Sequence, residues 1–577
     1  MIETIFLRLR FILIGLAVLA GLVVFQLLRI EFARGSIVYF RDLSETISQR
    51  PREFAPERGR LYDRDGDLLA TNDVQYELGL SPSYVVKPND VATTLSDILD
   101  KSVSELMLAV QSDKPYILVE RPVSAEIGYQ IKALANDENG LNLNGVDLTP
   151  IPHRFYPGGP LASQVLGFVA YNQAGRLVGY FGVEGFYNSL LSGRMVEGIE
   201  QVVPFEAQPD PTPAEGADLY LTLDRDIQYL VEVTMADAIA RYGAVSGTII
   251  VMDPKTGEIL GMSSWPTFDP NNYVQYPPTD PENPAVGGQY EPGSTFKILT
   301  MAAALDSGKV TPQTPFVDTG FIEVGGVPIR NWDGGAWGPV DMVGCLQHSL
   351  NVCMASLSTS LGPNVFYNYL SAFGIGHLTS VDLATETPGH LKKPGDPDWF
   401  DSELGTNSFG QGVAVTPIQL VTAVSAVANG GTMMQPHILL RVQDGGSVHT
   451  TRPQVLGRPI KPETAATLSE MLAQSLERGE GGNDVLVPGY RIAGKTGTAQ
   501  IPMPGGYDPS RSIASFIGWG PVDDPRFVVL VKLDRPATSI WGSETAAPVF
   551  SSLVRRLVVL MEIPPDDARR ALQSQAR

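Results

Sequence analysis

Three short polar strings, far apart along the chain, constrain its fold more than any other feature. They are Ser294-Thr295-Phe296-Lys297, Ser349-Leu350-Asn351 and Lys495-Thr496-Gly497-Thr498. A single Ser-x-x-Lys arises by chance in a chain of 577 residues. The three strings together, in this order, supply a nucleophile, two proton carriers and a carboxylate clamp. A fold that uses them must bring all three around a common cleft.

Ser294 has the surroundings of a nucleophile at the start of a helix. Glu291-Pro292-Gly293 precedes it, and the helix-forming run from Lys297 to Leu305 follows. In the first turn of a helix, the dipole and the free N–H groups stabilise negative charge near the serine oxygen. Lys297 lies three residues on, on the same face. A desolvated lysine near other cations can be neutral enough to take the serine proton.

Ser349 and Asn351 are predicted to lie in a turn between helices, with both side chains directed inward. Ser349 can relay a proton to a leaving amine, and the Asn351 amide offers a donor and an acceptor to a peptide-like substrate. Such a string met alone is most often a helix cap. For His348, next to Ser349, we expect a helix-end cap and not a catalytic contact.

The third string occupies a β-type segment. Because Gly497 has no side chain, a ligand backbone can approach the strand edge and add to it as an extra strand. Lys495 and the hydroxyls of Thr496 and Thr498 then form a site for a terminal carboxylate. The backbone N–H groups of Ser294 and Thr498 are candidates for an oxyanion hole. This chemistry needs neither a metal nor a cofactor.

The N-terminus contains an apolar run from Phe11 to Leu28, interrupted only by Gln26 and preceded by Arg8 and Arg10. As a helix it would be about 27 Å long, close to the hydrocarbon thickness of a bilayer. We therefore predict a single transmembrane anchor in the cytoplasmic membrane, with the N-terminus inside and the rest of the chain outside. A cleaved signal peptide is the alternative, because residues 17–20 are small and apolar.

Charge and cysteine content limit the classes of function. The net charge of −21 argues against nucleic acid as a partner. Cys345 and Cys353 are the only cysteines and stand on either side of Ser349. We favour two small buried hydrophobic side chains over a disulfide, which the sequence alone leaves possible. The six histidines form no pairing with a Gly-x-Ser-x-Gly elbow, which disfavours a Ser-His-Asp hydrolase.

The chain is too long for a single core, and its fold class is predicted as α/β (α+β). Residues 246–253 and 258–264 should form a β-hairpin, and 490–499, 512–518 and 527–533 three antiparallel strands covered by a helix over 547–561. The predicted segments are a cytoplasmic tail (1–10), the anchor (11–30), a mixed pedestal module (45–206), a Pro-rich linker (207–216), a large α/β domain (217–562) and a C-terminal tail (563–577) without a further domain.

With these spacings, the strings resemble the active-site motifs of penicillin-binding proteins and serine β-lactamases. Other stretches resemble those of the class B, monofunctional enzymes: Arg58–Ala70, Arg154–Gly159, Gly182–Gly185 and Leu221–Asp224. The resemblance implies that 45–206 is a class B dimerisation or pedestal domain and that 217–562 is a transpeptidase domain with a central antiparallel sheet flanked by helices.

The same resemblance implies a membrane-anchored D,D-transpeptidase that cross-links peptidoglycan. Ser294 would attack a D-Ala-D-Ala stem peptide, D-Ala would leave, and an amine of a neighbouring stem would resolve the acyl-enzyme. Penicillins and other β-lactams would imitate the donor and trap Ser294. The implied partners are a polytopic glycan polymerase and other division proteins.

Alternatives remain for the predicted subtype and for the predicted class of function. The stretches Ser515–Gly518, Ala546–Phe550 and Ile563–Pro565 resemble division-specific members more than elongation-specific ones. An elongation-specific transpeptidase and a β-lactam-sensing receptor remain the alternatives. An inactive scaffold is disfavoured by the intact strings. A hydrolytic β-lactamase is disfavoured because no carboxylate that would activate water is evident.

Overall fold

The structure is a computed structural model that describes residues 13–26, 29, 51–54, 56–136, 143–173, 176–193, 196–199, 215–479, 485–503 and 506–575. The chain forms two compact units. The first comprises Met1–Glu57 and Gly193–Glu215, and the second comprises Arg58–Ser192 and Gly216–Arg577. In the first unit, strand β1 (Pro51–Phe54) pairs antiparallel with β8 (Val196–Ile199).

The predicted anchor falls in the first unit. Residues 13–26 are helical. Among the residues that the structure describes, no helix combines the length and the apolar composition that a membrane crossing requires. The anchor predicted over 11–30 extends beyond the described residues at both ends. The tail predicted over 1–10 lies outside them, as does nearly all of the linker predicted over 207–216.

The second unit is built around a five-stranded antiparallel sheet. Its strand order is β11-β10-β22-β21-β20, so β20 is an edge strand. The bounds are Ser246–Met252 for β10, Ile259–Trp265 for β11, Ala493–Met503 for β20, Gly506–Gly520 for β21 and Phe527–Asp534 for β22. The predicted hairpin and the three predicted antiparallel strands are confirmed by this pairing.

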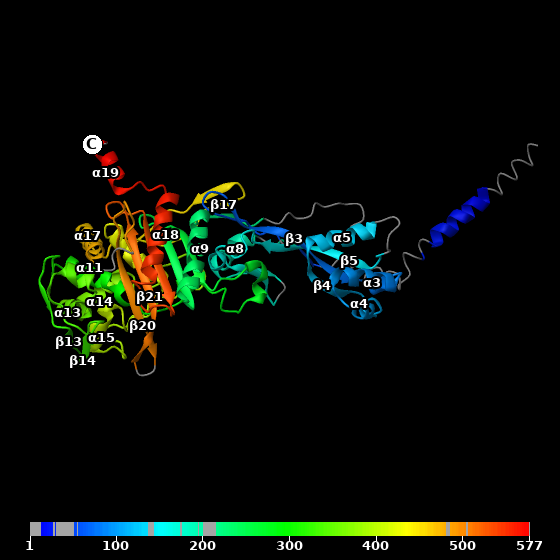
Figure 1. The fold of residues 1–577 in the computed structure, drawn as a ribbon. Helices are drawn as coiled ribbons and strands as arrows, with labels where there is room; N and C mark the ends of the chain where they lie inside the picture. The colour runs from blue at the N-terminus through cyan, green and yellow to red at the C-terminus, as the bar shows by residue number, and fades with distance from the viewer. Residues whose placement is uncertain are drawn as a thin grey trace, which may run out of the picture. The chain divides into compact units, whose positions relative to one another are not determined.

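Helices cover both faces of this sheet, because successive strand residues alternate between two cores. Ile249 and Val529 pack on one face against α9 (Arg225–Tyr242) and α18 (Ala546–Leu560), which lie beside each other in Figure 1. Ile250 and Leu530 pack on the other face against α11 (Lys297–Asp306) and α16 (Pro417–Ala428). The nucleophile string is therefore attached directly to the sheet through a shared core.

The remaining elements of the C-terminal part of this unit surround that core. They are β9 (Asp218–Leu221), η2 (Pro270–Gln275), α10 (Pro284–Gly287), η3 (Gly293–Phe296), β12 (Phe316–Asp318), β13 (Phe321–Val324), β14 (Val327–Arg330), β15 (Gly338–Val340), α12 (Met342–Gln347), α13 (Asn351–Leu361), α14 (Pro363–Ala372), α15 (Asp401–Thr406), η4 (Asn407–Phe409), β16 (Met433–Met434), β17 (Leu439–Asp444), β18 (Ser447–Thr450), β19 (Val455–Gly457) and α17 (Pro462–Arg478).

The chain after Pro565 is helical. Residues Asp566–Gln575 form the helix α19. Asp566 accepts a hydrogen bond from the backbone N–H of Arg491 at 2.9 Å. Two aspartates in the first turn favour this helix, because negative charge is stabilised at the positive end of the helix dipole.

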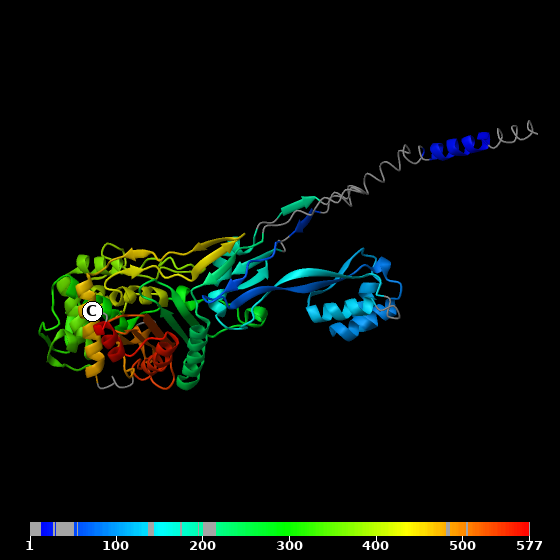
Figure 2. The same cartoon turned by 90° about the horizontal axis from the view of Figure 1, so that it is seen from above.

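The N-terminal part of the second unit has a small core of its own. Strand β3 (Leu68–Leu80) pairs with β4 (Ile117–Val123) and β5 (Val146–Phe155), and Figure 2 shows the long strands β3 and β5 running together. The other elements are β2 (Leu61–Tyr62), η1 (Pro82–Tyr84), α3 (Pro88–Leu99), α4 (Val103–Val110), α5 (Ala125–Asn136), α6 (Ser163–Leu166), β6 (Phe168–Tyr171), β7 (Leu177–Tyr180), α7 (Gly182–Phe186) and α8 (Asn188–Leu191).

A second sheet joins the two parts of this unit. Its order is β18-β17-β9-β2-β3-β4, with β5 paired to β3. Strand β2 pairs parallel with β9, so the hairpin of the N-terminal part extends a sheet of the C-terminal part. At the hairpin turn, Asp63 accepts hydrogen bonds from the backbone N–H groups of residues 65, 66 and 67. This is the polar turn that the sequence indicates.

A buried ion cluster fixes the junction. Glu184 is fully buried and accepts hydrogen bonds from Arg58 Nε and Arg154 Nε, each at 2.7 Å. Burial alone would raise the pKa of Glu184, but the two guanidinium groups lower it. Three stretches that the sequence analysis singled out as separate motifs thus meet in one ionic contact.

Candidate active site

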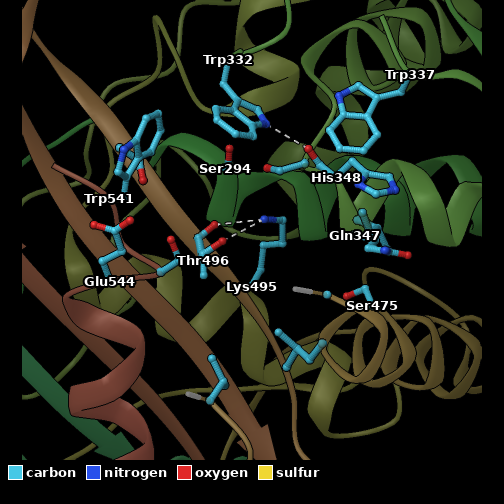
Figure 3. A pocket seen from close by; sticks show the side chains of 17 residues that line it. Ser294, Trp332, Trp337, Gln347, His348, Ser475, Lys495, Thr496, Trp541 and Glu544 are labelled. Carbon is cyan, nitrogen blue, oxygen red and sulfur yellow. Dashed lines mark hydrogen bonds between the residues drawn. The ribbon is translucent and has the colours of Figure 1, made fainter. Parts of the chain in front are cut away.

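Ser294 lies in the short 3₁₀-helix η3, which leads directly into α11. Residues three apart eclipse in a 3₁₀-helix, so Ser294 and Lys297 share one side. Ser294 lines a cleft of about 430 Å³ together with Ser349, Lys495, Thr496 and Thr498 (Figure 3). Within the described chain, Ser294 makes no hydrogen bond through its side chain, so its oxygen is free to meet a ligand.

Lys297 is fully buried and contacts the second string. Its Nζ lies 2.6 Å from the Ser349 carbonyl oxygen, 2.7 Å from Asn351 Oδ1 and 3.1 Å from Ser349 Oγ. Burial, followed by the nearby Lys495 cation, lowers the pKa of Lys297 well below its ordinary value. A neutral amine has two N–H donors and one lone pair. It can therefore donate to two of these three oxygens at a time and keep its lone pair available for a proton.

Ser349 occupies the turn between α12 and α13. Its φ of 53° is in the left-handed region, which is unfavourable for a residue with a side chain. The turn is held by Lys297 and by Trp332, whose Nε1 donates to the His348 carbonyl oxygen at 3.0 Å. His348 is the C-cap of α12, as predicted, and its ring stacks on Trp337.

Asn351 differs in one respect from the sequence-based expectation. Its Oδ1 accepts from Lys297, and its Nδ2 donates to the Arg330 carbonyl oxygen at 3.0 Å. The amide therefore orients Lys297 and fastens the turn to β14. One N–H of the amide group is left for a ligand, since an amide nitrogen carries two hydrogens.

Cys345 and Cys353 form a disulfide, with Cα atoms 6.1 Å apart. The preference for two unpaired cysteines was wrong, although both side chains are buried as expected. The helices α12 and α13 reverse direction around Ser349, and this brings two positions eight residues apart within bonding reach. The disulfide closes the turn that carries Ser349.

Removing this cross-link should destabilise the protein. For a C345A/C353A double variant, we expect the free energy of unfolding to fall by about 2–3 kcal/mol, because closure of a short loop is no longer imposed on the unfolded chain. Urea denaturation of wild type and variant measures the difference. Dithiothreitol should destabilise the wild type similarly and leave the double variant unchanged. A wild type insensitive to the reductant would contradict this account.

Strand β20 carries the third string along the edge of the sheet. Lys495 is buried, and its Nζ donates to the Thr496 carbonyl oxygen and hydroxyl, both at 3.2 Å. Burial lowers the pKa of Lys495 to about 8, so the side chain is mainly protonated at neutral pH. The Thr498 hydroxyl accepts from the Gly542 N–H at 3.0 Å. Both threonine hydroxyls therefore keep a hydrogen to donate, and with the ammonium they form an anion clamp.

Gly497 serves a purpose that the sequence did not suggest. A Cβ at this position would lie 2.3 Å from Ser515 Oγ and 2.8 Å from Thr295 Cγ2. The missing side chain thus lets the nucleophile turn pack against β20. Approach of a ligand backbone depends instead on the position of β20 at the sheet edge.

Several residues of the cleft were missed by the motif analysis. Trp332, Trp337, Trp541 and Glu544 line it. Trp332 and Trp541 meet edge to face, with ring centroids 5.2 Å apart. Tryptophans in Gly-rich loops that directly follow a strand were the available signal. In the described part of the chain, no group of His, Cys, Asp and Glu is arranged to hold a metal ion.

Comparison with known proteins identifies both parts of the chain. Residues 247–555 match the family described as the penicillin binding protein transpeptidase domain, and residues 53–205 match the penicillin-binding protein dimerisation domain. The chain is 34% identical to the stage V sporulation protein D of Bacillus subtilis, over 97% of this chain and 86% of that protein. It is 28% identical to the peptidoglycan D,D-transpeptidase FtsI of Escherichia coli, over 94% and 91%.

A solved structure agrees with these matches. The crystal structure of penicillin binding protein 2X from Streptococcus thermophilus superimposes with a TM-score of 0.74 at 26% identity, covering 88% of this chain and 80% of that one. The similarity therefore extends well beyond the residues of the three strings.

Proposed function

The chain belongs to the penicillin-binding proteins of class B, with a dimerisation domain and a transpeptidase domain, and on this premise we propose that it is a serine D-Ala-D-Ala transpeptidase that cross-links peptidoglycan stem peptides. We also propose the catalytic set Ser294, Lys297, Ser349, Asn351 and Lys495. The observation that carries the assignment is the contact of Lys297 Nζ with Ser349 and Asn351 beneath a cleft that Ser294 lines.

Acylation begins with the neutral amine of Lys297 as base. It takes the Ser294 proton while Ser294 Oγ bonds to the carbonyl carbon of the penultimate D-Ala. The backbone N–H groups of Ser294 and Thr498 stabilise the oxyanion. When the peptide C–N bond breaks, the proton passes from Lys297 through the Ser349 hydroxyl to the leaving D-Ala amine.

Deacylation reverses the route with a different amine. The amine of a second stem peptide attacks the ester carbon of the acyl-enzyme and gives its proton, through Ser349, to Lys297. The Ser294–carbonyl bond breaks, and Ser294 regains a hydrogen. A β-lactam enters the first half of this cycle, and its ring-opened amine stays attached. It therefore blocks the approach of the second substrate.

The sequence and the relatives support a proposed setting for the reaction. We propose a single-pass anchor over 11–30 that places the pedestal domain (45–206) and the transpeptidase domain (217–562) outside the cytoplasmic membrane. A glycan polymerase and other division proteins are the proposed partners. Septal wall synthesis is favoured because a relative spanning nearly the whole chain is named FtsI. Depletion that gives filaments would support septal synthesis, and depletion that gives rounded cells would support the elongation role.

The proposal is tested with the full-length protein in detergent. We expect covalent labelling by a fluorescent penicillin, competition by a stem-peptide donor, D-Ala release, and a cross-linked product when an acceptor amine is added. Mass spectrometry identifies the product. Labelling without transfer to any acceptor would favour the β-lactam-sensing receptor instead.

The clamp gives a separate prediction. Lys495→Ala should weaken binding of carboxylate-bearing donors by about 1–3 kcal/mol, because a charged hydrogen bond to the carboxylate is lost. The measurement is the KM for D-Ala release, with a thermal melt to check folding. A variant that unfolds would mean that Lys495 is structural. An unchanged KM would show that Lys495 does not bind the carboxylate of the donor.

A further inference from the structure

The loop between β22 and α18 carries a carboxylate into the cleft that the reaction cycle above does not use. This loop runs from Arg535 to Thr545 and contributes Trp541 and Glu544 to the cleft wall, on the same side as Thr496 in Figure 3. Glu544 is exposed, whereas the lysines of the site are buried. Its position at the mouth of the cleft therefore calls for an explanation.

The loop is fastened to the clamp strand by backbone and side-chain contacts. Glu544 Oε2 accepts from the Ser539 hydroxyl at 2.5 Å, and Ser539 Oγ in turn accepts from the Trp541 N–H at 3.2 Å. The Gly542 N–H donates to Thr498 Oγ1. A Cβ at Gly542 would lie 2.2 Å from the Gly497 carbonyl oxygen, so the loop packs directly on β20. The loop that carries Glu544 is thus held against the clamp strand, and Ser539 orients the carboxylate.

The charge of Glu544 has no counter-ion among the residues that the structure describes. It is the only acidic side chain that lines the cleft, and within the described part of the chain it makes no ion pair. An oriented, unpaired carboxylate at a cleft mouth attracts a cationic group of a ligand and repels an anionic one. Lys495 already takes the anionic end of a donor, so the two charges suit a ligand with opposite charges at its two ends.

The aromatic side chains beside Glu544 fit the same kind of ligand. Trp541 meets Trp332 edge to face at an interplanar angle of 71°, and Trp332 is anchored to the turn of Ser349 through the His348 carbonyl oxygen. The face of an indole ring attracts an ammonium group, and the edge-to-face contact fixes the orientation of both rings. The pair therefore offers aromatic surface at the cleft mouth on which an aliphatic amine can rest.

We propose that Glu544 and Trp541 form a subsite for a primary ammonium group of a stem peptide, and that Glu544 determines specificity for that group. The proposal rests on the proposed transpeptidase function and deepens it. The ammonium has two possible sources: the side chain of the diamino acid in the donor stem, or the amine of the acceptor stem. The chemistry at Glu544 is the same for both, and kinetics separate them.

A structural role for Glu544 makes a different prediction. The residue precedes α18 by two positions, where a negative charge also favours the positive end of the helix dipole. If that were its role, substitution of Glu544 would change the free energy of unfolding and would affect the acylation rates of all ligands equally. If Glu544 instead recognises an amine, its substitution would leave the free energy of unfolding nearly unchanged. The effect on acylation would then depend on the charge of the ligand.

The first experiment uses two penicillins that differ by one amine. Ampicillin carries a primary ammonium in its side chain, and benzylpenicillin lacks it. Acylation rates of the full-length protein are measured for wild type, E544Q and E544K. We expect the ratio of ampicillin to benzylpenicillin rates to fall about two- to fivefold in E544Q, the range of an exposed ion pair, and further in E544K. The matched controls E282Q and E282K change an exposed charge outside the cleft and should keep the wild-type ratio.

The second experiment separates the two sources of the ammonium. Donor stem peptides with a free or an acetylated side-chain amine are compared in D-Ala release. Acceptors are compared by the partition of the acyl-enzyme between transfer and hydrolysis. A loss in E544Q confined to the free-amine donor assigns the subsite to the donor, and a shift toward hydrolysis assigns it to the acceptor.

The proposal is overturned if E544Q and E544K change none of these ratios, or if they change all ligands equally together with the melting temperature. The result is distinguishable from failure of the transpeptidase function itself. In that case the wild type would release no D-Ala from any donor, whether or not the penicillins label it.

Discussion

A Ser294→Ala variant is expected to lose covalent labelling by fluorescent penicillin and to release no D-Ala, with a fall in the acylation rate of at least about 10⁴-fold. The oxygen that forms the acyl bond is absent, and a neighbouring residue cannot replace it. Ser349, the other serine of the proposed set, is engaged by Lys297, whose Nζ donates to Ser349 Oγ at 3.1 Å. The measurement is gel fluorescence with purified full-length protein, supported by intact-mass spectrometry.

The matched control for this variant is Ser307→Ala. Ser307 caps the C-terminal end of α11, the helix that follows Ser294, and its hydroxyl bonds only to the Ala304 carbonyl oxygen. Labelling should persist in this control. Labelling that survives in Ser294→Ala would show that another residue is the nucleophile. The assignment of this cleft as the active site would then be wrong.

Lys297→Met is expected to reduce the acylation rate by about 10²- to 10⁴-fold, the range that a positioned general base contributes. Methionine retains the length and most of the volume of the side chain but cannot accept a proton. Single-turnover acylation measured by stopped flow gives the rate. Lys309→Met, which alters an exposed lysine just beyond α11, should leave the rate unchanged.

The pH dependence gives an independent test of the same role. The wild-type rate should rise with pH as Lys297 loses its proton, and burial together with Lys495 moves this rise well below the ordinary lysine pKa of 10.5. Above a pH of about 8, Lys495 becomes neutral and carboxylate-bearing donors bind less well, so the profile falls again. Lys297→Met should lack the rising limb. A rising limb that persists in the variant would identify a different base.

The features predictable from sequence were those encoded locally. The hairpin of β10 and β11 and the strands β20 to β22 followed from alternating apolar runs and turn residues. Ser294 and Lys297 could be placed together because positions three apart share one face of a helical turn. The buried environment of Lys297 could be anticipated, since mostly apolar residues follow it from Ile298 to Leu305.

The remaining features depend on contacts between distant segments. The hydrogen bond of Asn351 to Lys297 and the close packing of Gly497 on Thr295 require coordinates, because neither has a signature in its own string. The disulfide could not be decided because the distance between Cys345 and Cys353 depends on how two helices turn around Ser349. The role of Trp541 and Glu544 in the cleft depends on a loop that packs on a strand more than 40 residues earlier.

The parallel pairing of β2 with β9 bears on how this protein can be divided. Strand β9 has β17 on one side and β2 on the other. A fragment that began at β9 would leave Leu219 and its neighbours on an open edge, where another chain could add. The N-terminal part therefore covers an edge of a sheet in the catalytic part, and a fragment that lacked it would offer that edge to another chain.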